Sequence, residues 1–209
     1  MVRVVLFPGW SGNSPKQNFS LLKEDLEKIP GIKVEIIDYL GIGGPFTKMR
    51  TRDSIWKIIR RAEEKYRQIP QDEPIIALGH SLGAIILRLL IERGHKFKLA
   101  IFAGGPHMGF LPRFKIMEPL ALLFRVKLYF ELKPGSDFLK ILDPPPRGIY
   151  IASANDEKVS LESALPSKTV ERFILQCGHD MFPKERDKVP ESAIPIVTKI
   201  VEEFVKNSQ

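Results

Sequence analysis

Short apolar runs alternate with amphipathic segments along almost the whole chain. The apolar runs have the length of buried strands, and the apolar residues between them recur at helical spacing. Strands joined by helical crossovers form a mostly parallel sheet with helices on both faces. The pattern therefore predicts an α/β fold with a doubly wound sheet of about six strands. The expected strands are Val2–Phe7, Lys33–Asp38, Pro74–Leu78, Lys98–Ala103, Gly148–Ala154 and Val170–Gln176, and the expected helices cover 16–29, 52–68, 82–93 and 187–206.

The segment from Gly104 to Arg147 interrupts this alternation. It is rich in proline, has no clean strand, and contains the apolar patch Leu120–Phe124 followed by further apolar residues up to Phe130. A plain loop of this length is rare inside a compact domain. We therefore expect residues 105–147 to form an inserted helical cap over the functional site of the protein. The alternative is a pair of core-packed helices without a lid role.

Length and composition are those of an ordinary globular protein. The 209 residues suit one domain, 1–209, and 44% of them are hydrophobic and 27% charged. No apolar run approaches the roughly 18 residues that span a bilayer, and the N-terminus has the pattern of a first strand rather than of a signal peptide. The single cysteine, Cys177, is expected to be a small buried hydrophobe. Together these features predict a cytoplasmic protein.

The formal net charge of +7 raises the question of a nucleic-acid partner. Basic residues gather in two groups, Lys48, Arg50 and Arg52, and Arg60, Arg61, Lys65 and Arg67. The second group lies on an amphipathic helical pattern that Glu63 and Glu64 interrupt, which favours a solvated helix face. We therefore expect no nucleic-acid partner. Peripheral contact with lipid is compatible with the sequence, and the oligomeric state is not predicted.

Gly79-His80-Ser81-Leu82-Gly83 carries the clearest chemical signal. It matches the pattern G-x-S-x-G and lies between a predicted strand and a predicted helix. A sharp strand-to-helix turn holds such a serine in a strained conformation with its hydroxyl exposed. The flanking glycines remove side chains that would clash where the helix folds back over the strand. Ser81 is therefore the expected nucleophile.

A serine hydroxyl needs a base to take its proton, and the chain has four histidines. His179 follows the last predicted strand, at the sheet edge where α/β proteins place functional groups, and is the expected base. His80 lies within the turn, so a packing role is expected. His95 lies in a charged turn and is expected to be solvated. His107 is close to the site, at the start of the cap.

The carboxylate that orients the base is expected between the serine and the histidine in the sequence. Asp156 follows the predicted strand that precedes the His179 strand, and is the expected acid. The alternatives are Glu157, Asp143, Asp137 and Asp180, the last of which is expected to cap its own loop.

The negative charge that develops during acyl transfer needs two N–H donors. Leu82 supplies one at the start of its helix. The other is expected from the loop that follows the first strand, where Gly9 allows close approach and the Trp10 N–H is the natural donor. If the first strand lies beside the third, with the second outside it, the strand order reverses between the first and third strands. A crevice forms at such a reversal, and here it would lie between that loop and the serine turn.

At four places the chain resembles the α/β-hydrolase superfamily and, within it, the bacterial lipases and esterases. Leu6–Trp10 looks like the oxyanion loop, and Gly79–Gly83 like the nucleophile elbow. Gly105–Gly109 is similar to the Thr-Pro-His-x-Gly segment of such lipases, and Leu132–Leu139 to their Leu-x-Pro-Gly-Ser-x-Phe-Leu stretch. The resemblance implies an α/β-hydrolase fold, a cap over 105–140, and the triad Ser81, Asp156 and His179.

The chain departs from the lipase pattern at two places, and these departures affect the expected substrate rather than the expected triad. Pro8 stands where lipases usually carry histidine before the glycine. In addition, Arg52–Trp56 and Cys177–His179 look more like a compact cytosolic serine-hydrolase family of similar length. The residues of the cap expected to line the substrate pocket are His107, Met108, Leu123, Phe124 and Phe130.

The expected function is the hydrolysis of a small-molecule acyl ester through an acyl-enzyme intermediate. Thioester hydrolysis and acyl transfer on the same triad are alternatives, as is a binding protein that keeps the fold without catalysis. The sequence has no His-x-x-x-His pattern and no glycine-rich nucleotide motif, so neither a metal nor a cofactor is expected.

Overall fold

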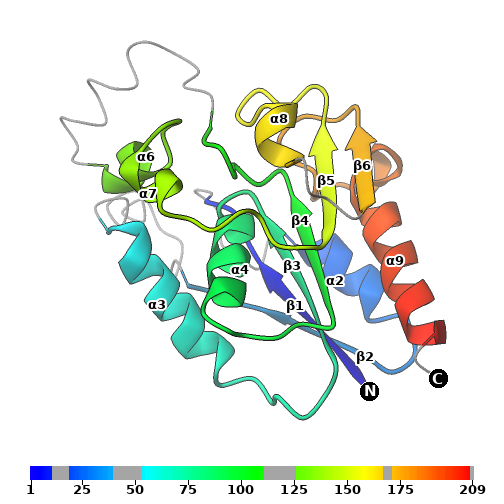
Figure 1. Ribbon diagram of the computed structural model, residues 1–209. Coiled ribbons are helices and arrows are strands. Elements are labelled where there is room, and N and C mark those ends of the chain that lie inside the picture. Colours follow the sequence, from blue (N-terminus) through cyan, green and yellow to red (C-terminus); the bar gives the residue numbers. More distant parts are fainter. Residues whose placement is uncertain (11–18, 40–52, 111–125, 167–170, 208–209) are drawn as a thin grey trace.

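The computed structural model describes residues 1–10, 19–39, 53–110, 126–166 and 171–207 (Figure 1). The strands in these ranges are β1 (Val2–Phe7), β2 (Ile32–Ile36), β3 (Ile75–His80), β4 (Leu99–Ala103), β5 (Ile149–Ser153) and β6 (Glu171–Leu175). The helices there are α2 (Ser20–Leu26), α3 (Ile55–Tyr66), α4 (Leu82–Glu92), α6 (Lys127–Glu131), α7 (Asp137–Lys140), α8 (Leu161–Ala164), the 3-10 helix η2 (Arg186–Glu191) and α9 (Ile194–Asn207).

The six strands of the described residues form one parallel sheet in the order β2-β1-β3-β4-β5-β6. In β1, Val5 lies opposite Glu35 of β2 on one side and opposite Ala77 of β3 on the other. The first strand is therefore beside the third, and the strand order reverses between them, which meets the condition stated for a crevice between the loop after β1 and the serine turn. In sheets of this kind ligands bind outside the carboxyl ends of the strands at this point.

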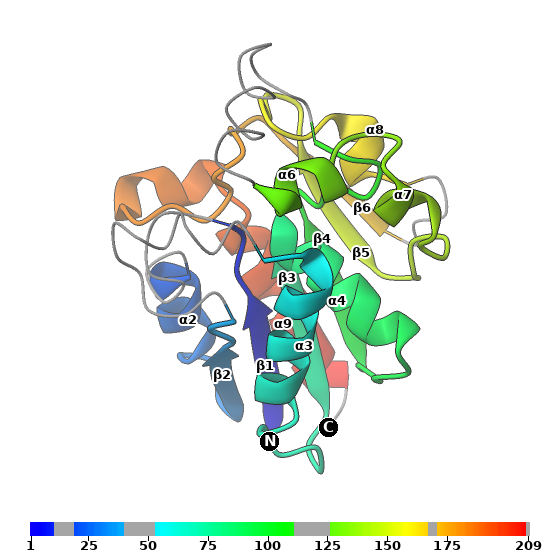
Figure 2. The same ribbon diagram turned by 90° about the vertical axis from the view of Figure 1, so that its left-hand side faces the viewer.

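Alternate strand residues face two separate apolar layers. In β1, Val5 and Phe7 point to the layer completed by α3 and α4, whereas Val4 and Leu6 point to the layer completed by α2 and α9. Figures 1 and 2 show these helix pairs on opposite faces of the sheet. Every residue of β1 and β3 is buried, because both faces of the sheet are covered. The predicted doubly wound α/β architecture is confirmed.

Two helix boundaries differ from the predicted ones. The sequence predicts a last helix from residue 187, whereas α9 begins at Ile194 and η2 precedes it. Pro190 lies inside η2, lacks an N–H, and disfavours the α conformation at the residue before it. Of the expected helix 16–29, α2 covers Ser20–Leu26, and 16–18 lie outside the described residues.

The described residues of the segment 104–147 contain no strand, as predicted, and form the short helices α6 and α7. Both helices lie at the carboxyl end of the sheet, close to the start of α3 (Figures 1 and 2). The Ile55 N–H, at the start of α3, donates to Glu131 Oε2 over 2.7 Å. Trp56 packs edge-on against Phe138, with 5.5 Å between ring centroids. This part of the segment is therefore attached to α3.

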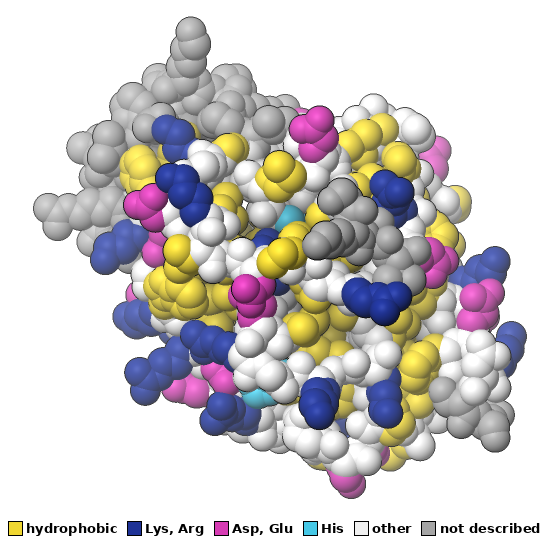
Figure 3. Space-filling view, viewed as in Figure 1, with side chains coloured by type: hydrophobic (Ala, Val, Ile, Leu, Met, Phe, Trp, Pro, Cys, Tyr) yellow, Lys and Arg dark blue, Asp and Glu magenta, His cyan; other side chains and the backbone are white. Residues whose placement is uncertain are grey.

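Three basic residues on α3, Lys57, Arg60 and Arg61, are paired with acidic ones. Arg60 bonds to Glu64 over 3.1 Å, and Asp53 accepts from both Lys57 and Arg61. Figure 3 shows acidic side chains among the basic ones on the face in view. The helix face thus has the ion-paired, solvated character expected for it, whereas the group at Lys48, Arg50 and Arg52 lies outside the described residues. No helix in the described ranges is long and apolar enough to cross a membrane.

The His95 side chain is only 18% exposed and contacts Glu63, so it is less solvated than its charged turn led us to expect. Its Nε2 lies 2.9 Å from Glu63 Oε1, and its ring packs edge-on against Tyr66. Glu63 also accepts from Arg67 (2.7 Å) and Arg93 (2.6 Å). The hydrogen bond from His95, together with those from the two arginines, lowers the pKa of Glu63 to about 2. The cluster connects the end of α3 to the turn after α4, a contact that sequence spacing does not reveal.

Candidate active site

Ser81 stands at the turn between β3 and α4 in a conformation that few residues adopt. Its φ is +54°, and it is the one non-glycine residue with positive φ in the described ranges. A side chain on Gly83 would begin 1.9 Å from the Phe7 carbonyl oxygen, and one on Gly79 would begin 2.4 Å from the Gly83 carbonyl oxygen. The two glycines are therefore required for α4 to approach the sheet, as the sequence argument anticipated.

His179 bridges Ser81 and Asp156. Its Nε2 lies 2.9 Å from Ser81 Oγ, and its Nδ1 lies 2.7 Å from Asp156 Oδ2. With Nδ1–H donating to the carboxylate, Nε2 is left to accept from the serine hydroxyl. The side chains of His179 and Asp156 are only 6% and 1% exposed. The structure thus brings together the three residues singled out from the sequence, from the ends of β3, β5 and β6.

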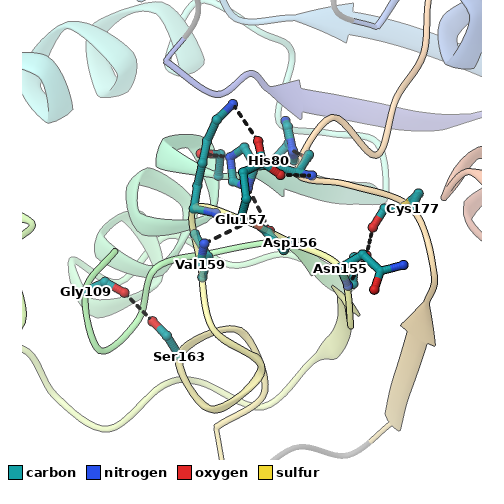
Figure 4. A network of polar contacts seen from close by, with 12 residues as sticks. His80, Gly109, Asn155, Asp156, Glu157, Val159, Ser163 and Cys177 are labelled. Carbon is teal, nitrogen blue, oxygen red and sulfur yellow. Dashed lines mark hydrogen bonds and ion pairs between the residues drawn. The ribbon is translucent and has the colours of Figure 1, made fainter. Parts of the chain in front are cut away.

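The second oxygen of Asp156 is held by the backbone. Oδ1 accepts from the N–H groups of Lys158 (2.8 Å) and Val159 (2.9 Å), and Figure 4 shows the side chain among these contacts. Burial alone would raise the pKa of Asp156. The hydrogen bond and charge of His179, together with the two N–H groups, outweigh it and hold the pKa below its usual value. The carboxyl group is therefore ionised and fixed in orientation.

Glu157, the adjacent alternative, contacts the same histidine at a different point. Its Oε2 lies 3.4 Å from the backbone nitrogen of His179, not from the ring. Asp137 is fully exposed at the start of α7, and Asp143 contributes a backbone carbonyl to Arg88. Asp180 is exposed. Among the carboxylates weighed from the sequence, Asp156 is the one that contacts the imidazole.

The loop after β1 lies against the serine turn. A side chain on Gly9 would begin 2.9 Å from Ser81 Cβ, so the loop backbone touches the elbow there. Leu82 is the first residue of α4, and its N–H therefore has no acceptor inside the helix. Trp10 is 44% exposed. The remainder of the loop expected to hold the oxyanion, residues 11–13, lies outside the described residues.

His80 does more than pack inside the turn, the role expected for it. Its ring packs edge-on against Phe19 and Phe182, and its Nε2 is 3.0 Å from the backbone carbonyl oxygen of His179. Burial, and the charge that His179 can carry, lower the pKa of His80 to about 4. His80 is therefore neutral near pH 7, and its Nε2–H donates to the carbonyl. No local sequence signal distinguishes this role from ordinary packing.

The residues expected to line the substrate pocket differ in how far they are buried. His107 is 4% exposed, and its ring lies edge-on to Phe102 and Tyr150 within an apolar layer. Neither ring nitrogen has a hydrogen-bond partner in the described structure, and burial lowers the pKa of His107 to about 3. Met108 is 59% exposed. Phe130 is half-buried in α6, and Leu123 and Phe124 lie outside the described residues.

Ser163 in α8 fixes the backbone around His107. Its hydroxyl donates to the Gly109 carbonyl (2.7 Å, Figure 4) and accepts from the Met108 N–H (3.0 Å). Its own carbonyl accepts from the His107 N–H over 3.2 Å. The start of the expected cap is therefore fastened to the segment that follows Asp156.

The described residues also include potential metal ligands and the single cysteine. No cluster of three or more histidine, cysteine or acidic side chains suited to a metal ion occurs in the described ranges. Burial raises the pKa of the Cys177 thiol, which is half-buried beside the loop of His179. Its backbone carbonyl accepts from the Ser153 hydroxyl.

Comparison with protein families adds an independent line of evidence. The model of the palmitoyl protein thioesterase family matches residues 3–130, more than half of the chain. The chain belongs to the palmitoyl protein thioesterase family. The match covers the loop after β1 and the serine turn, and it ends before Asp156 and His179. Comparison with curated proteins finds no significant match.

Comparison with solved structures identifies proteins that share the fold of this chain. A structure from the work on LipS and LipT, two metagenome-derived lipolytic enzymes, has a TM-score of 0.68 and 13% identity, covering 99% of this chain and 94% of the other. Mouse alpha/beta hydrolase domain-containing protein 10 has a TM-score of 0.64 and 16% identity, covering 99% and 90%. Est1E from Butyrivibrio proteoclasticus has a TM-score of 0.57 and 15% identity, covering 99% and 87%. The fold is that of the α/β-hydrolases, as the sequence resemblance implied.

Proposed function

We propose that this member of the thioesterase family hydrolyses acyl esters through a triad of Ser81, His179 and Asp156. The observation that supports this most directly is the continuous chain of contacts, 2.9 Å from Ser81 Oγ to His179 Nε2 and 2.7 Å from His179 Nδ1 to Asp156 Oδ2. Such a chain lets a serine hydroxyl lose its proton as it attacks a carbonyl.

In the proposed acylation step, Ser81 Oγ attacks the carbonyl carbon of the bound ester while its proton passes to His179 Nε2. Asp156 stabilises the resulting imidazolium through Nδ1–H. The carbonyl oxygen becomes an oxyanion, which the N–H groups of Leu82 and Trp10 bind. The tetrahedral intermediate then breaks its bond to the leaving alcohol or thiol, which takes the proton from His179 and departs. Ser81 is left esterified to the acyl group.

Deacylation repeats these steps with water. His179 accepts a proton from a water molecule as its oxygen attacks the acyl-enzyme carbonyl, and the same two N–H groups bind the second oxyanion. Collapse of this intermediate breaks the bond to Ser81 Oγ, which recovers its proton from His179. The carboxylic acid is released, and the enzyme returns to its starting state.

A thioester is a second candidate for the bond that is broken. The match to the palmitoyl protein thioesterase family over residues 3–130 favours an acyl thioester, and the triad chemistry is the same for both leaving groups. The described helices of the segment 105–147, α6 and α7, lie at the carboxyl end of the sheet. We propose that this segment acts as a cap and that Met108 and Phe130 contribute apolar surface to the acyl group. The cytoplasmic location stays a prediction.

The experiment combines active-site labelling with a substrate series. A fluorophosphonate probe is expected to label the wild-type protein and Ser20→Ala, which changes an exposed serine in α2, but not Ser81→Ala. Hydrolysis of p-nitrophenyl esters of increasing chain length, alongside acyl thioesters with the same chains, then identifies the preferred bond and length. Folded wild-type protein that neither reacts with the probe nor hydrolyses any member of either series would instead be a binding protein with this fold.

A further inference from the structure

Tyr39 makes a buried contact that the proposed mechanism leaves unused. It lies three residues beyond the end of β2, and none of its surface is exposed. Its hydroxyl donates to the backbone carbonyl of Pro8, in the loop that follows β1. Burial, and after it the charge of Asp38, raise the pKa of Tyr39, so the hydroxyl keeps its proton and acts as a donor.

The Pro8 carbonyl occupies an enclosed position. A side chain on Gly83, in the first turn of α4, would begin 2.9 Å from this oxygen, so the oxygen lies close to the start of α4. A buried carbonyl without a donor is costly, and the Tyr39 hydroxyl is the donor that the described structure provides. The Pro8–Gly9 peptide plane is thereby held from one side.

The next peptide plane carries the proposed oxyanion donor. The planes Pro8–Gly9 and Gly9–Trp10 are joined only through the φ and ψ of Gly9, because each peptide unit is itself rigid. Glycine has the widest choice of these two angles, so the Trp10 N–H keeps one direction only when the Pro8–Gly9 plane and Gly9 itself are both restrained. On its other side the loop touches the elbow, where Gly9 lies against Ser81 Cβ.

We infer that Tyr39 is a positioning residue for the oxyanion loop: its hydroxyl fixes the Pro8–Gly9 peptide and thereby directs the Trp10 N–H toward the developing oxyanion. This inference rests on the proposed function. It assigns Tyr39 an effect on the transition state rather than on substrate binding, because an oxyanion exists only during the chemical step.

The chain offers a closely matched control. Tyr150 of β5 is also fully buried, and its hydroxyl donates to the carbonyl of another proline, Pro146, over 2.6 Å. Tyr39→Phe and Tyr150→Phe therefore remove the same group from the same kind of contact. Both are expected to lower Tm, whereas only Tyr39→Phe is expected to affect transition-state binding.

For Tyr39→Phe, kcat and kcat/KM for a p-nitrophenyl ester are expected to fall by about 10- to 100-fold, less than the loss of a whole oxyanion donor. KM is expected to match that of wild type. The midpoint of the acid limb of the pH–rate profile is also expected to be unchanged, since the triad is untouched. Tyr150→Phe is expected to retain the wild-type kcat. All assays are run below the unfolding range of each variant, with circular dichroism confirming the fold.

Gly9→Ala tests the same loop with Tyr39 intact. Its methyl group would begin 2.9 Å from Ser81 Cβ, so the loop and the serine turn must move apart. It is expected to lower kcat with unchanged KM and pH profile, and the double variant is expected to lose much less than the product of the two single losses, because both changes misplace one donor.

Three outcomes would overturn the inference: a wild-type kcat for Tyr39→Phe, an equal loss in Tyr150→Phe, or a wild-type kcat for Gly9→Ala. They differ from failure of the proposed function, in which wild-type protein itself shows no hydrolysis and no labelling of Ser81.

Discussion

Nδ1 of His179 lies 2.7 Å from Oδ2 of Asp156, and both side chains are almost completely shielded from water. The adjacent Glu157 reaches only the backbone nitrogen of His179, at 3.4 Å. Two neighbouring carboxylates thus contact one histidine in different ways, and their substitutions are expected to have different effects.

Asp156→Asn is expected to lower kcat by about 10³- to 10⁴-fold, because an amide neither favours the productive tautomer of His179 nor stabilises its charged form. Glu157→Gln is the matched control, and its kcat is expected to change less than about 5-fold, since its contact is long and its side chain is 37% exposed. Ester hydrolysis at pH 8 measures both. Equal losses in the two variants would contradict the assignment of Asp156.

His80→Phe is expected to lower kcat about 3- to 10-fold, the effect of one hydrogen bond. It removes one of two donors to the His179 carbonyl, which keeps its bond from the Met181 N–H (2.9 Å), and it retains an aromatic ring. His80→Gln retains an N–H donor and is expected to recover most of the loss. Because the pKa of His80 is about 4, the ratio of variant to wild-type kcat should be constant between pH 6 and 9. A ratio that varied with pH there would indicate that His80 itself exchanges protons during turnover.

His107→Leu is expected to stabilise the protein. Both ring nitrogens of His107 are buried without partners in the described structure, so an apolar side chain of similar size should raise the free energy of unfolding by about 1–2 kcal/mol at pH 7.5. The gain should increase at pH 5. The folded-state pKa is about 3 and that of the unfolded chain about 6.5, so between these values the unfolded state binds the extra proton and acid destabilises the native state.

Urea unfolding of wild type and His107→Leu at the two pH values measures this difference. Ester kinetics serve as the control: an increase in KM for long acyl chains in the variant would show that His107 contacts substrate, the role expected from the sequence.

Glu63→Gln is expected to lower the free energy of unfolding by about 1–3 kcal/mol at pH 7 without changing kcat. Glu63 has its folded-state pKa depressed to about 2, so it contributes stability above the unfolded value near 4.5 and loses it as the pH falls toward 2. Wild type and variant should therefore converge over that range. Unfolding curves that stay parallel below pH 4 would contradict the role assigned to the ion cluster.

The alternation of strands and helices could be predicted, and the three residues of the proposed triad could be singled out, because their signals are local. The elbow glycines lie within one pentapeptide, and Asp156 and His179 each follow an apolar run that ends in a short loop. Once the sheet is parallel, these loops must all lie at its carboxyl edge.

The contacts that could not be predicted join residues far apart in the chain. Tyr39 and Pro8, His80 and His179, and Glu63 and His95 each meet only after the sheet has formed. Neither member of such a pair carries a local pattern that identifies its partner. Burial of His107 was missed for a related reason, because a histidine near a proposed site has the same sequence signal whether it faces a ligand or an apolar layer.

The position of β6 has a consequence for how the protein loses activity. This strand pairs only with β5 in the described sheet, and its residues Glu171, Arg172 and Ile174 are exposed. An edge strand with one neighbour opens locally at a lower free energy than the central strands, and its charged residues oppose pairing with a foreign strand. Because His179 follows β6, such an opening would separate the base from Ser81 while β1, β3 and β4 stay folded. Amide exchange in β6 and thermal inactivation should therefore report the same opening event, below the temperature at which the sheet itself unfolds.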